Sequence, residues 1–400
     1  MPKKSVFAQL DACAVPPHNL MPSPRHWNAG LLRYRDKLWL GYRYHRAETK
    51  DSRCGVAMCE IDEQGEPQSE SQMLNFYSPR DCEHHEDCRL FLFRGEPYIS
   101  WTSMEGYMPG VDYSCVVKYA KLRLTGKKWS VVEEWKPNFG DNTGFKKEKN
   151  WVFFEHKDEL YFVYAMDPDH VVCKIEGSKV VKEYKTDGAK WHWGHQRGGT
   201  PPVDLGYGRM MCIFHSSIFT EEPPHFVRYY AAAYTFENKP PFKVLQISQQ
   251  PILAGSEEDG HRIDPRWTEG WKPYVVFPCG LIADKKGWLI SLGINDWQSA
   301  IARISESELM LGPADGTGFK PRFFRTENGT LSIRYTDAHQ HTTFLHWDIF
   351  PNPRGNSAGM GYMQASNARE AVEISEVHGV TEITEIEYRK ALRQRELMLR

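Results

Sequence analysis

Apolar and polar residues alternate in a pattern that recurs five times along the 400-residue chain. Each copy has an apolar run, a short polar turn and a second apolar run, and each turn is centred on Asp, Gly or Lys. These turn residues favour the tight connections of β-hairpins. The five predicted hairpins lie at 29–43, 88–102, 151–165, 201–215 and 279–293.

The stretches between the hairpins also read as strands, as in YSCVVKYAKLRL and RYYAAAYTFE. One hairpin with one or two outer strands is the content of a propeller blade, and propellers have ~4–8 blades. We therefore expect an all-β protein whose residues 1–304 form a five-bladed β-propeller. A two-sheet sandwich is the alternative, but it does not explain five similar hairpins.

Residues 305–400 predict a C-terminal, strand-rich extension that ends in a helix. Thr384 and Glu387 have the spacing of a capping box at the start of that helix. The helix either docks on a blade or a partner, or is an ordinary terminal helix.

Charge and composition limit the classes of function. Lys and Arg number 50 against 52 Asp and Glu, so net charge does not indicate nucleic acid or an anionic membrane as a partner. No run approaches the ~18 apolar residues of a membrane span, and the N-terminal segment has no signal-peptide core. The nine Cys are scattered, and we predict no metal site. We expect a soluble, cytoplasmic protein with reduced thiols, and the sequence leaves its oligomeric state open.

The densest group of ionisable residues is Cys82-Glu-His-His-Glu-Asp-Cys88. No second ligand cluster accompanies His84 and His85, so we interpret this pair as part of a solvated loop beside a pocket. A disulfide between Cys82 and Cys88 is not expected in a reducing compartment. The segment is best explained as the rim of a reactive pocket.

Polar residues stand where the predicted hairpins begin and end. The first strand of each propeller blade lines the central channel, so we expect these side chains to converge. Their donors and acceptors suit a polyhydroxylated substrate, and their cations suit an anionic group. The residues are Arg25, Asn28, Arg43, Glu86, Asp87, Arg89, Lys149, Asn150, Arg197, His215 and Asp296.

Four segments of the chain resemble glycoside hydrolase family 130, the mannoside phosphorylases and their relatives. EDCRLF is similar to the family's Glu-Asp-Pro-Arg segment, and RGGTPPV to its Gly-x-Pro-Pro segment. The tyrosine-led strand YYAAAYTFE and the pair VVFPCGLI and GINDWQ resemble the third and fourth. The resemblance covers roughly residues 20–304 in the family's order, and it implies a five-bladed propeller and glycosyl transfer with inversion.

The resemblance also implies roles for single residues. Asp87 matches the general acid, which protonates the leaving oxygen, in some members through a sugar hydroxyl. Phosphate, or water in hydrolytic members, attacks the opposite face, and one related branch uses nucleotide-sugar donors. No cofactor is implied, since inorganic phosphate or a sugar nucleotide is the co-substrate. The implied substrate-binding residues are Asn28, Arg43, Glu86, Arg89, Asn150, Tyr230 and Asp296, and those for phosphate or donor are Lys149, Arg197 and His215.

The chain departs from the family around the phosphate site. Cys88 replaces the proline of the acid motif, and only Lys118 stands on the strand that normally carries basic residues. His195 and Arg197 stand where a lysine is usual. A transferase or hydrolase is therefore as well supported as a phosphorylase of β-mannosides. Two further alternatives stay open: a non-catalytic propeller that binds glycan or nucleotide, and a transferase that modifies a macromolecule.

Overall fold

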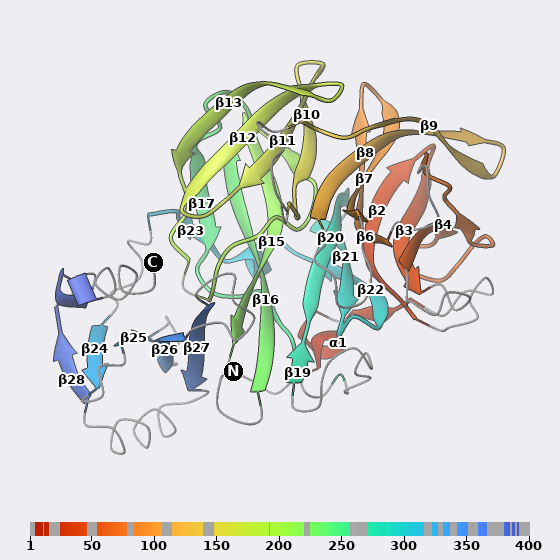
Figure 1. Ribbon diagram of the computed structural model, residues 1–400. Helices are drawn as coiled ribbons and strands as arrows, with labels where there is room; N and C mark the ends of the chain where they lie inside the picture. The colour runs from red at the N-terminus through yellow and green to blue at the C-terminus, as the bar shows by residue number, and fades with distance from the viewer. Residues whose placement is uncertain are drawn as a thin grey trace.

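The structure is a computed structural model, and Figure 1 shows its ribbon. It describes residues 5–10, 12–15, 25–45, 54–77, 84–105, 114–138, 148–191, 193–219, 225–256, 259, 271–285, 287–315, 322–326, 331–336, 342–350, 359–365, 380–384, 386–388 and 390–391.

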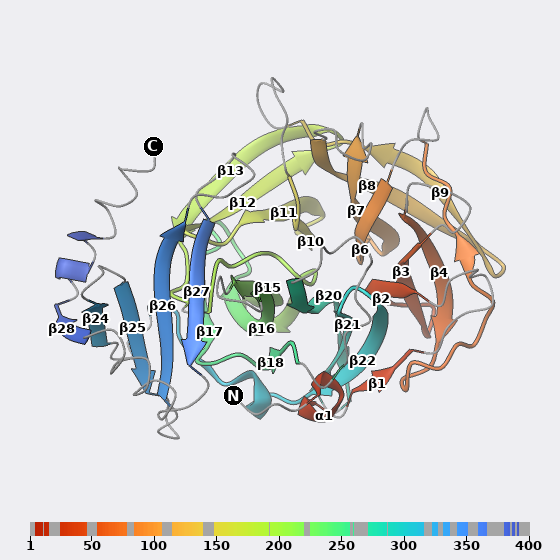
Figure 2. The same ribbon diagram turned by 60° about the horizontal axis from the view of Figure 1, so that its bottom comes forward.

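Five sheets surround a common centre, as Figure 2 shows, so the five-bladed β-propeller is confirmed. Strand β2 (His26–Tyr34) contacts the innermost strands of both neighbouring blades, β6 (His84–Phe93) and β20 (Val276–Asp284). The remaining strands of the first three blades are β3 (Lys37–His45), β4 (Cys54–Ile61), β5 (Gln72–Met73), β7 (Glu96–Glu105), β8 (Ser114–Thr125), β9 (Lys128–Trp135), β10 (Val152–His156), β11 (Glu159–Ala165), β12 (Asp169–Glu176) and β13 (Lys179–Asp187).

The fourth and fifth blades include strands that are distant in sequence. The fifth blade is completed by the N-terminal strand β1 (Cys13–Ala14), which pairs with β22 (Gln298–Ile304) and so closes the ring. In the fourth blade the outermost strand β23 (Leu311–Pro313) follows residue 304, where we placed the end of the propeller. The other strands of these two blades are β14 (Val203–Gly206), β15 (Arg209–Phe219), β16 (His225–Glu237), β17 (Val244–Ser248), β18 (Leu253–Ala254), β19 (Trp271–Tyr274) and β21 (Gly287–Ile294).

Each predicted hairpin is present as a pair of adjacent strands. In the first, residues Arg35 and Asp36 connect β2 to β3 with positive φ angles of 52° and 58°. Positive φ at both positions defines a type I′ turn, whose twist matches that of the flanking strands. The same left-handed pair connects β6 to β7, β10 to β11 and β14 to β15.

A separate five-stranded sheet follows the propeller in the chain, and its strand β27 (Gly359–Ala365) contacts β15. The predicted capping box is confirmed. The Thr384 hydroxyl accepts a hydrogen bond from the Glu387 amide at 3.2 Å, and the Glu387 carboxylate accepts one from the Thr384 amide at 2.7 Å. Helical residues follow at 386–388. The other strands are β24 (Arg322–Thr326), β25 (Leu331–Thr336), β26 (Thr342–Phe350) and β28 (Val380–Ile383).

In the described part of the chain, an apolar layer lies between each pair of neighbouring blades. Between the first two blades, Leu32 and Trp39 pack with Leu90 and Trp101, and all four are at most 4% exposed. Fully burying one such side chain contributes about 1.5–3 kcal/mol, so the layers hold the blades in fixed relative positions.

The innermost strands carry bulges at their beginnings. The pairing register shifts between Trp27 and Gly30 in the first blade, and between Glu86 and Arg89 in the second. The bulged residues Asn28 and Asp87 have φ angles of 51° and 53°. A bulge bends the strand and redirects its side chains, which makes this end of the propeller the candidate site.

Candidate active site

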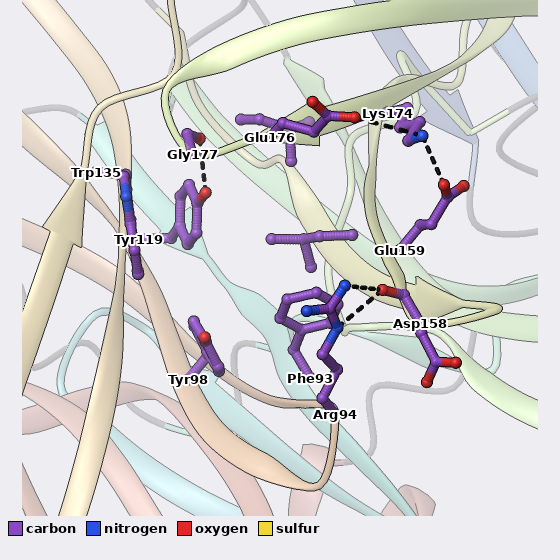
Figure 3. A pocket seen from close by; sticks show the side chains of 12 residues that line it. Phe93, Arg94, Tyr98, Tyr119, Trp135, Asp158, Glu159, Lys174, Glu176 and Gly177 are labelled. Carbon is purple, nitrogen blue, oxygen red and sulfur yellow. Dashed lines mark hydrogen bonds and ion pairs between the residues drawn. The ribbon is translucent and has the colours of Figure 1, made fainter.

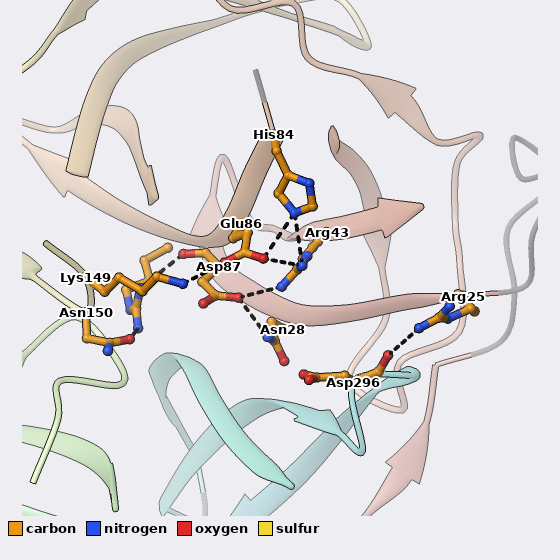
Figure 4. Close-up of polar contacts among 10 residues, drawn as sticks. Arg25, Asn28, Arg43, His84, Glu86, Asp87, Lys149, Asn150 and Asp296 are labelled. Carbon is orange, nitrogen blue, oxygen red and sulfur yellow. Dashed lines mark hydrogen bonds and ion pairs between the residues drawn. The ribbon is translucent and has the colours of Figure 1, made fainter. Parts of the chain in front are cut away.

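Asp87 lies at the bulge of β6, and its side chain is 9% exposed. Its Oδ1 accepts a hydrogen bond from Asn28 Nδ2 at 2.7 Å and lies 3.5 Å from Arg43 Nη1 (Figure 4). Both partners come from the first blade. The two bulges therefore bring together an amide, a guanidinium and a carboxylate that are far apart in sequence.

The neighbouring carboxylate, Glu86, is surrounded by basic groups. It forms an ion pair with Arg43, accepts a hydrogen bond from Lys149 Nζ at 2.9 Å, and lies 3.1 Å from His84 Nε2. Burial raises the pKa of Glu86, but the charges of Arg43 and Lys149 and the contact with His84 together hold it well below its usual range. Glu86 is therefore an ionised counter-ion, while Asp87 is held by fewer charged partners.

Arg43 joins the two carboxylates. Its guanidinium lies 4.7 Å from the centroid of the Trp27 ring and 3.2 Å from His84 Nε2. Burial lowers the pKa of Arg43, but Cys54, Glu86 and Asp87 raise it by more, so the group stays charged. The pKa of His84 is also raised, because its hydrogen bonds to Cys54 and Glu86 outweigh the effect of burial.

Asp296 approaches the same group from the fifth blade. It lies in the turn after β21 with a φ angle of 50°, and its charge also raises the pKa of Arg43. Its main-chain oxygen accepts a hydrogen bond from Arg25 Nη2 at 3.5 Å. The guanidinium of Arg25 lies 4.8 Å from the Trp297 ring. The charges of Asp87 and Asp296 both act on Arg43, so these residues share one end of the propeller, called the chamber below (Figure 4).

Arg89 has a different arrangement from the one we expected of a substrate ligand. It is 2% exposed and donates to the main-chain oxygens of Asp87 at 3.0 Å and Gly198 at 3.1 Å, and also to that of Gly199. A further bond at 3.2 Å reaches Asn150 Oδ1. Arg89 thus joins three blades and fixes the backbone of Asp87, which makes it a positioning residue.

The residues expected to bind phosphate or donor lie on the third and fourth blades. Arg197 donates to the Ser217 hydroxyl, and its guanidinium lies 5.7 Å from the Tyr229 ring. His215 pairs with Arg197 through the main chain and is fully buried against Phe277, with ring centroids 4.3 Å apart. Burial and the charges of Arg197 and Arg89 hold the pKa of His215 well below its usual range, so its ring is neutral.

Tyr229 is a residue of this group that the sequence analysis missed. Burial raises the pKa of its phenol, and the charges of Arg197, Asp296, Lys149 and Asp87 all act on it. These residues therefore share one electrostatic environment. Consecutive side chains of a strand point to opposite faces, so Tyr230, which we expected in the site, lies on the other face of β16. Burial raises the pKa of Tyr230 to about 12, and Arg228 acts against this rise.

His84, His85 and Lys118 lie in surroundings that the sequence did not predict. The interpretation of His84 and His85 as a solvated loop is wrong, since both lie in β6 and are 1% and 4% exposed. Lys118 lies 3.6 Å from Glu105 and 3.7 Å from Glu134 and so has its own carboxylate partners. Cys82, for which no disulfide is expected, falls outside the described part of the chain.

Comparisons with known proteins identify relatives of this fold. The model of glycoside hydrolase family 130, described as beta-1,4-mannooligosaccharide phosphorylase, matches residues 146–311, and the resemblance to that family is confirmed. A comparison with curated protein sequences finds no match.

Solved structures with this fold include a candidate glycoside hydrolase of Parabacteroides distasonis. It is 14% identical with a TM-score of 0.51, over 70% of this chain and 86% of that one. Another is a structure from work on family 130 hydrolases that target beta-1,2 mannosidic linkages in Candida mannan. It is 12% identical with a TM-score of 0.50, over 73% of this chain and 86% of that one. At these identities the likeness concerns the fold. Among the described residues, no helix has the length and apolar character needed to cross a membrane.

Proposed function

We propose that the chain is a carbohydrate-active enzyme that transfers a mannose-like glycosyl unit with inversion of configuration, and that Asp87 is the proton donor. The observation that carries this proposal is the pairing of two unequal carboxylates. Glu86 is neutralised by Arg43 and Lys149, whereas Asp87 is buried beside Asn28 and Arg43. A carboxylate with a strongly lowered pKa is a poor acid and a poor base, so Asp87 is the better candidate for proton transfer.

In the proposed step the Asp87 carboxyl gives its proton to the glycosidic oxygen while the bond from that oxygen to the anomeric carbon breaks. An oxygen of the co-substrate forms the new bond from the opposite face. With inorganic phosphate, a β-mannoside gives α-mannose 1-phosphate and a free acceptor sugar. Asp87 is left as a carboxylate and takes up a proton from water before the next turnover.

The position of Arg197 favours an anionic co-substrate over water. Arg43 and Lys149 are balanced by the carboxylates of Glu86 and Asp87. Arg197 has no carboxylate partner among the described residues, and the neutral ring of His215 lies beside it. Cations that a protein carboxylate does not fully neutralise suit phosphate or a diphosphate donor. The low basicity of Glu86 also makes it unsuited to activating water.

The proposal is tested with β-1,4-mannobiose plus inorganic phosphate, with α-mannose 1-phosphate and with GDP-mannose, while release of sugar, phosphate or nucleotide is followed. We expect turnover of at least one of these, and a loss of about 10²–10⁴-fold in Asp87→Asn, the range for general acid catalysis. Asp36→Asn is the matched control, because Asp36 is exposed in a hairpin turn at the other end of the blade. Turnover that survives in Asp87→Asn would reject its role, and saturable binding without turnover would favour a binding protein.

A further inference from the structure

A pocket lies between the second and third blades, near their hairpin turns and apart from the Asp87 site (Figure 3). Its volume is about 300 Å³, at the lower end of the ~300–1,000 Å³ of small-molecule sites. Arg94 and Asp158, which lie in the turns after β6 and β10, form part of its wall. Strand β6 runs from the Asp87 chamber to this turn. At ~3.3 Å per residue, the two sites are about 20 Å apart.

The second blade supplies an aromatic wall. The rings of Tyr119 and Trp135 are 5.0 Å apart with an angle of 21°, and those of Tyr98 and Trp135 are 6.2 Å apart with an angle of 20°. Phe93 lies edge-on to Tyr98, with an angle of 70° between the rings. The rings of Tyr98, Trp135 and Tyr119 are stacked and do not form a cage that would surround a cation. Trp135 is the half-buried ring of the three that a ligand can reach, since Tyr98 and Tyr119 are 8% and 2% exposed, and an accessible aromatic ring suits the apolar face of a sugar.

A polar wall lies opposite the rings, formed by the third blade and by Arg94 of the second. Lys174 Nζ lies 2.6 Å from Glu159 Oε1 and 3.5 Å from Glu176 Oε1. Arg94 donates from Nε and Nη2 to the main-chain oxygen of Asp158 at 2.9 and 2.7 Å. Carboxylates and cations with spare acceptors and donors at the pocket edge match the hydroxyl groups of a sugar.

The charges of the pocket argue against an anionic ligand. Carboxylates outnumber cations, since Asp158, Glu159 and Glu176 face Arg94 and Lys174. The charge of Lys174 is already balanced by two of these carboxylates, Glu159 and Glu176, so Lys174 would attract a phosphate only weakly. An uncharged, hydroxyl-rich ligand fits both walls.

We propose that this pocket is a second glycan-binding site, which holds one or two neutral sugar units of a longer chain away from the catalytic chamber. Such a site keeps a polymeric substrate or acceptor on the enzyme between turnovers. The proposal rests on the proposed function only for the choice of sugar in the test.

The test titrates wild type, Trp135→Ala and Tyr207→Ala with β-1,4-mannotetraose and, separately, with cello- and xylotetraose, by calorimetry. Tyr207 is the matched control, because it is 97% exposed in another hairpin turn and does not line the pocket. We expect a binding step in wild type and Tyr207→Ala that weakens at least tenfold in Trp135→Ala. Activity on mannobiose, if present, should stay unchanged in all three.

A second variant, Glu176→Ala, guards against misfolding of the tryptophan variant, since the Glu176 side chain is 66% exposed and carries little of the core. It should weaken the same binding step while its thermal unfolding matches wild type. The proposal is overturned if none of the three sugars gives a binding step that both substitutions weaken. Because binding is read without turnover, a failure of the catalytic proposal would leave this result interpretable.

Discussion

Residues with positive φ occur at both ends of the innermost strands, but in different surroundings. At the hairpin end, Arg35 and Asp36 have positive φ angles in an exposed turn. At the chamber end, Asn28 and Asp87 have nearly the same φ angles, but they are buried within strands. A left-handed residue in a turn reverses the chain, whereas one in a strand costs about 1–3 kcal/mol and is retained where it orients a functional side chain. The difference supports the proposal that the end with Asn28 and Asp87 is the functional end.

The largest difference in stability should come from the carboxylates at the two ends. Glu86→Gln removes the buried carboxylate that Arg43 and Lys149 share and leaves Arg43 with Asp87 alone, and breaking a buried pair costs about 3–5 kcal/mol. Glu159→Gln removes the exposed partner of Lys174 and should change the free energy of unfolding very little. Urea denaturation of both variants measures the contrast, and equal losses would contradict it.

The same carboxylate should make stability depend on pH. The pKa of Glu86 is lowered on folding, so its contribution is present above the unfolded value of about 4.3 and is lost as the pH falls below it. Wild type should therefore lose stability between about pH 5 and pH 3 more steeply than Glu86→Gln. Parallel denaturation curves for the two proteins across this interval would show that Glu86 is not held ionised.

Arg89 and Arg94 both donate to main-chain oxygens, but their substitution should affect stability and activity differently. Arg89→Lys loses the planar fork that holds three blades together, and we expect a loss of about 2–4 kcal/mol with a lower kcat and little change in KM. Arg94→Lys, at the hairpin end, should leave kcat and the unfolding midpoint unchanged. If Arg89→Lys instead raises KM alone, the residue binds substrate and does not position Asp87.

The smallest effects should come from the left-handed residues themselves. Asp36→Gly keeps a favourable turn backbone and should leave activity unchanged, with a stability change within about 1 kcal/mol. Asn28→Gly also tolerates the positive φ, but it removes the amide that donates to Asp87 and should lower kcat/KM about tenfold. Comparing kcat/KM of the two variants isolates the side chain from the backbone, and equal values would remove Asn28 from the site.

The hairpins could be predicted from the sequence because alternation and turn residues are local signals. The pairing of β1 with β22 and of β17 with β23 could not, since those partners are separated by long stretches of chain. The bulge between Glu86 and Arg89 also leaves no mark in the sequence and interrupts the alternation, so the pattern does not show that β6 begins at His84.

The candidate site was predictable where a motif marks a position. Asn28 and Arg43 contact Asp87, and the charge of Asp296 acts on Arg43, while the roles of these residues in binding and catalysis stay predictions. Arg89 bonds to main-chain oxygens inside the propeller, and Tyr229 rather than Tyr230 lies among the charged groups of the site. Both outcomes depend on which face of a strand turns inward. A shift of one residue reverses that face, and no local pattern fixed it here.

The most direct test of the central claim is the stereochemistry of the first product. With one acid and an external nucleophile, β-1,4-mannobiose and phosphate should give α-mannose 1-phosphate, seen by phosphorus and proton NMR before anomers equilibrate. Transfer from GDP-mannose, an α-linked donor, should likewise give a β-linked product. A product that retains the configuration of the donor would contradict the account.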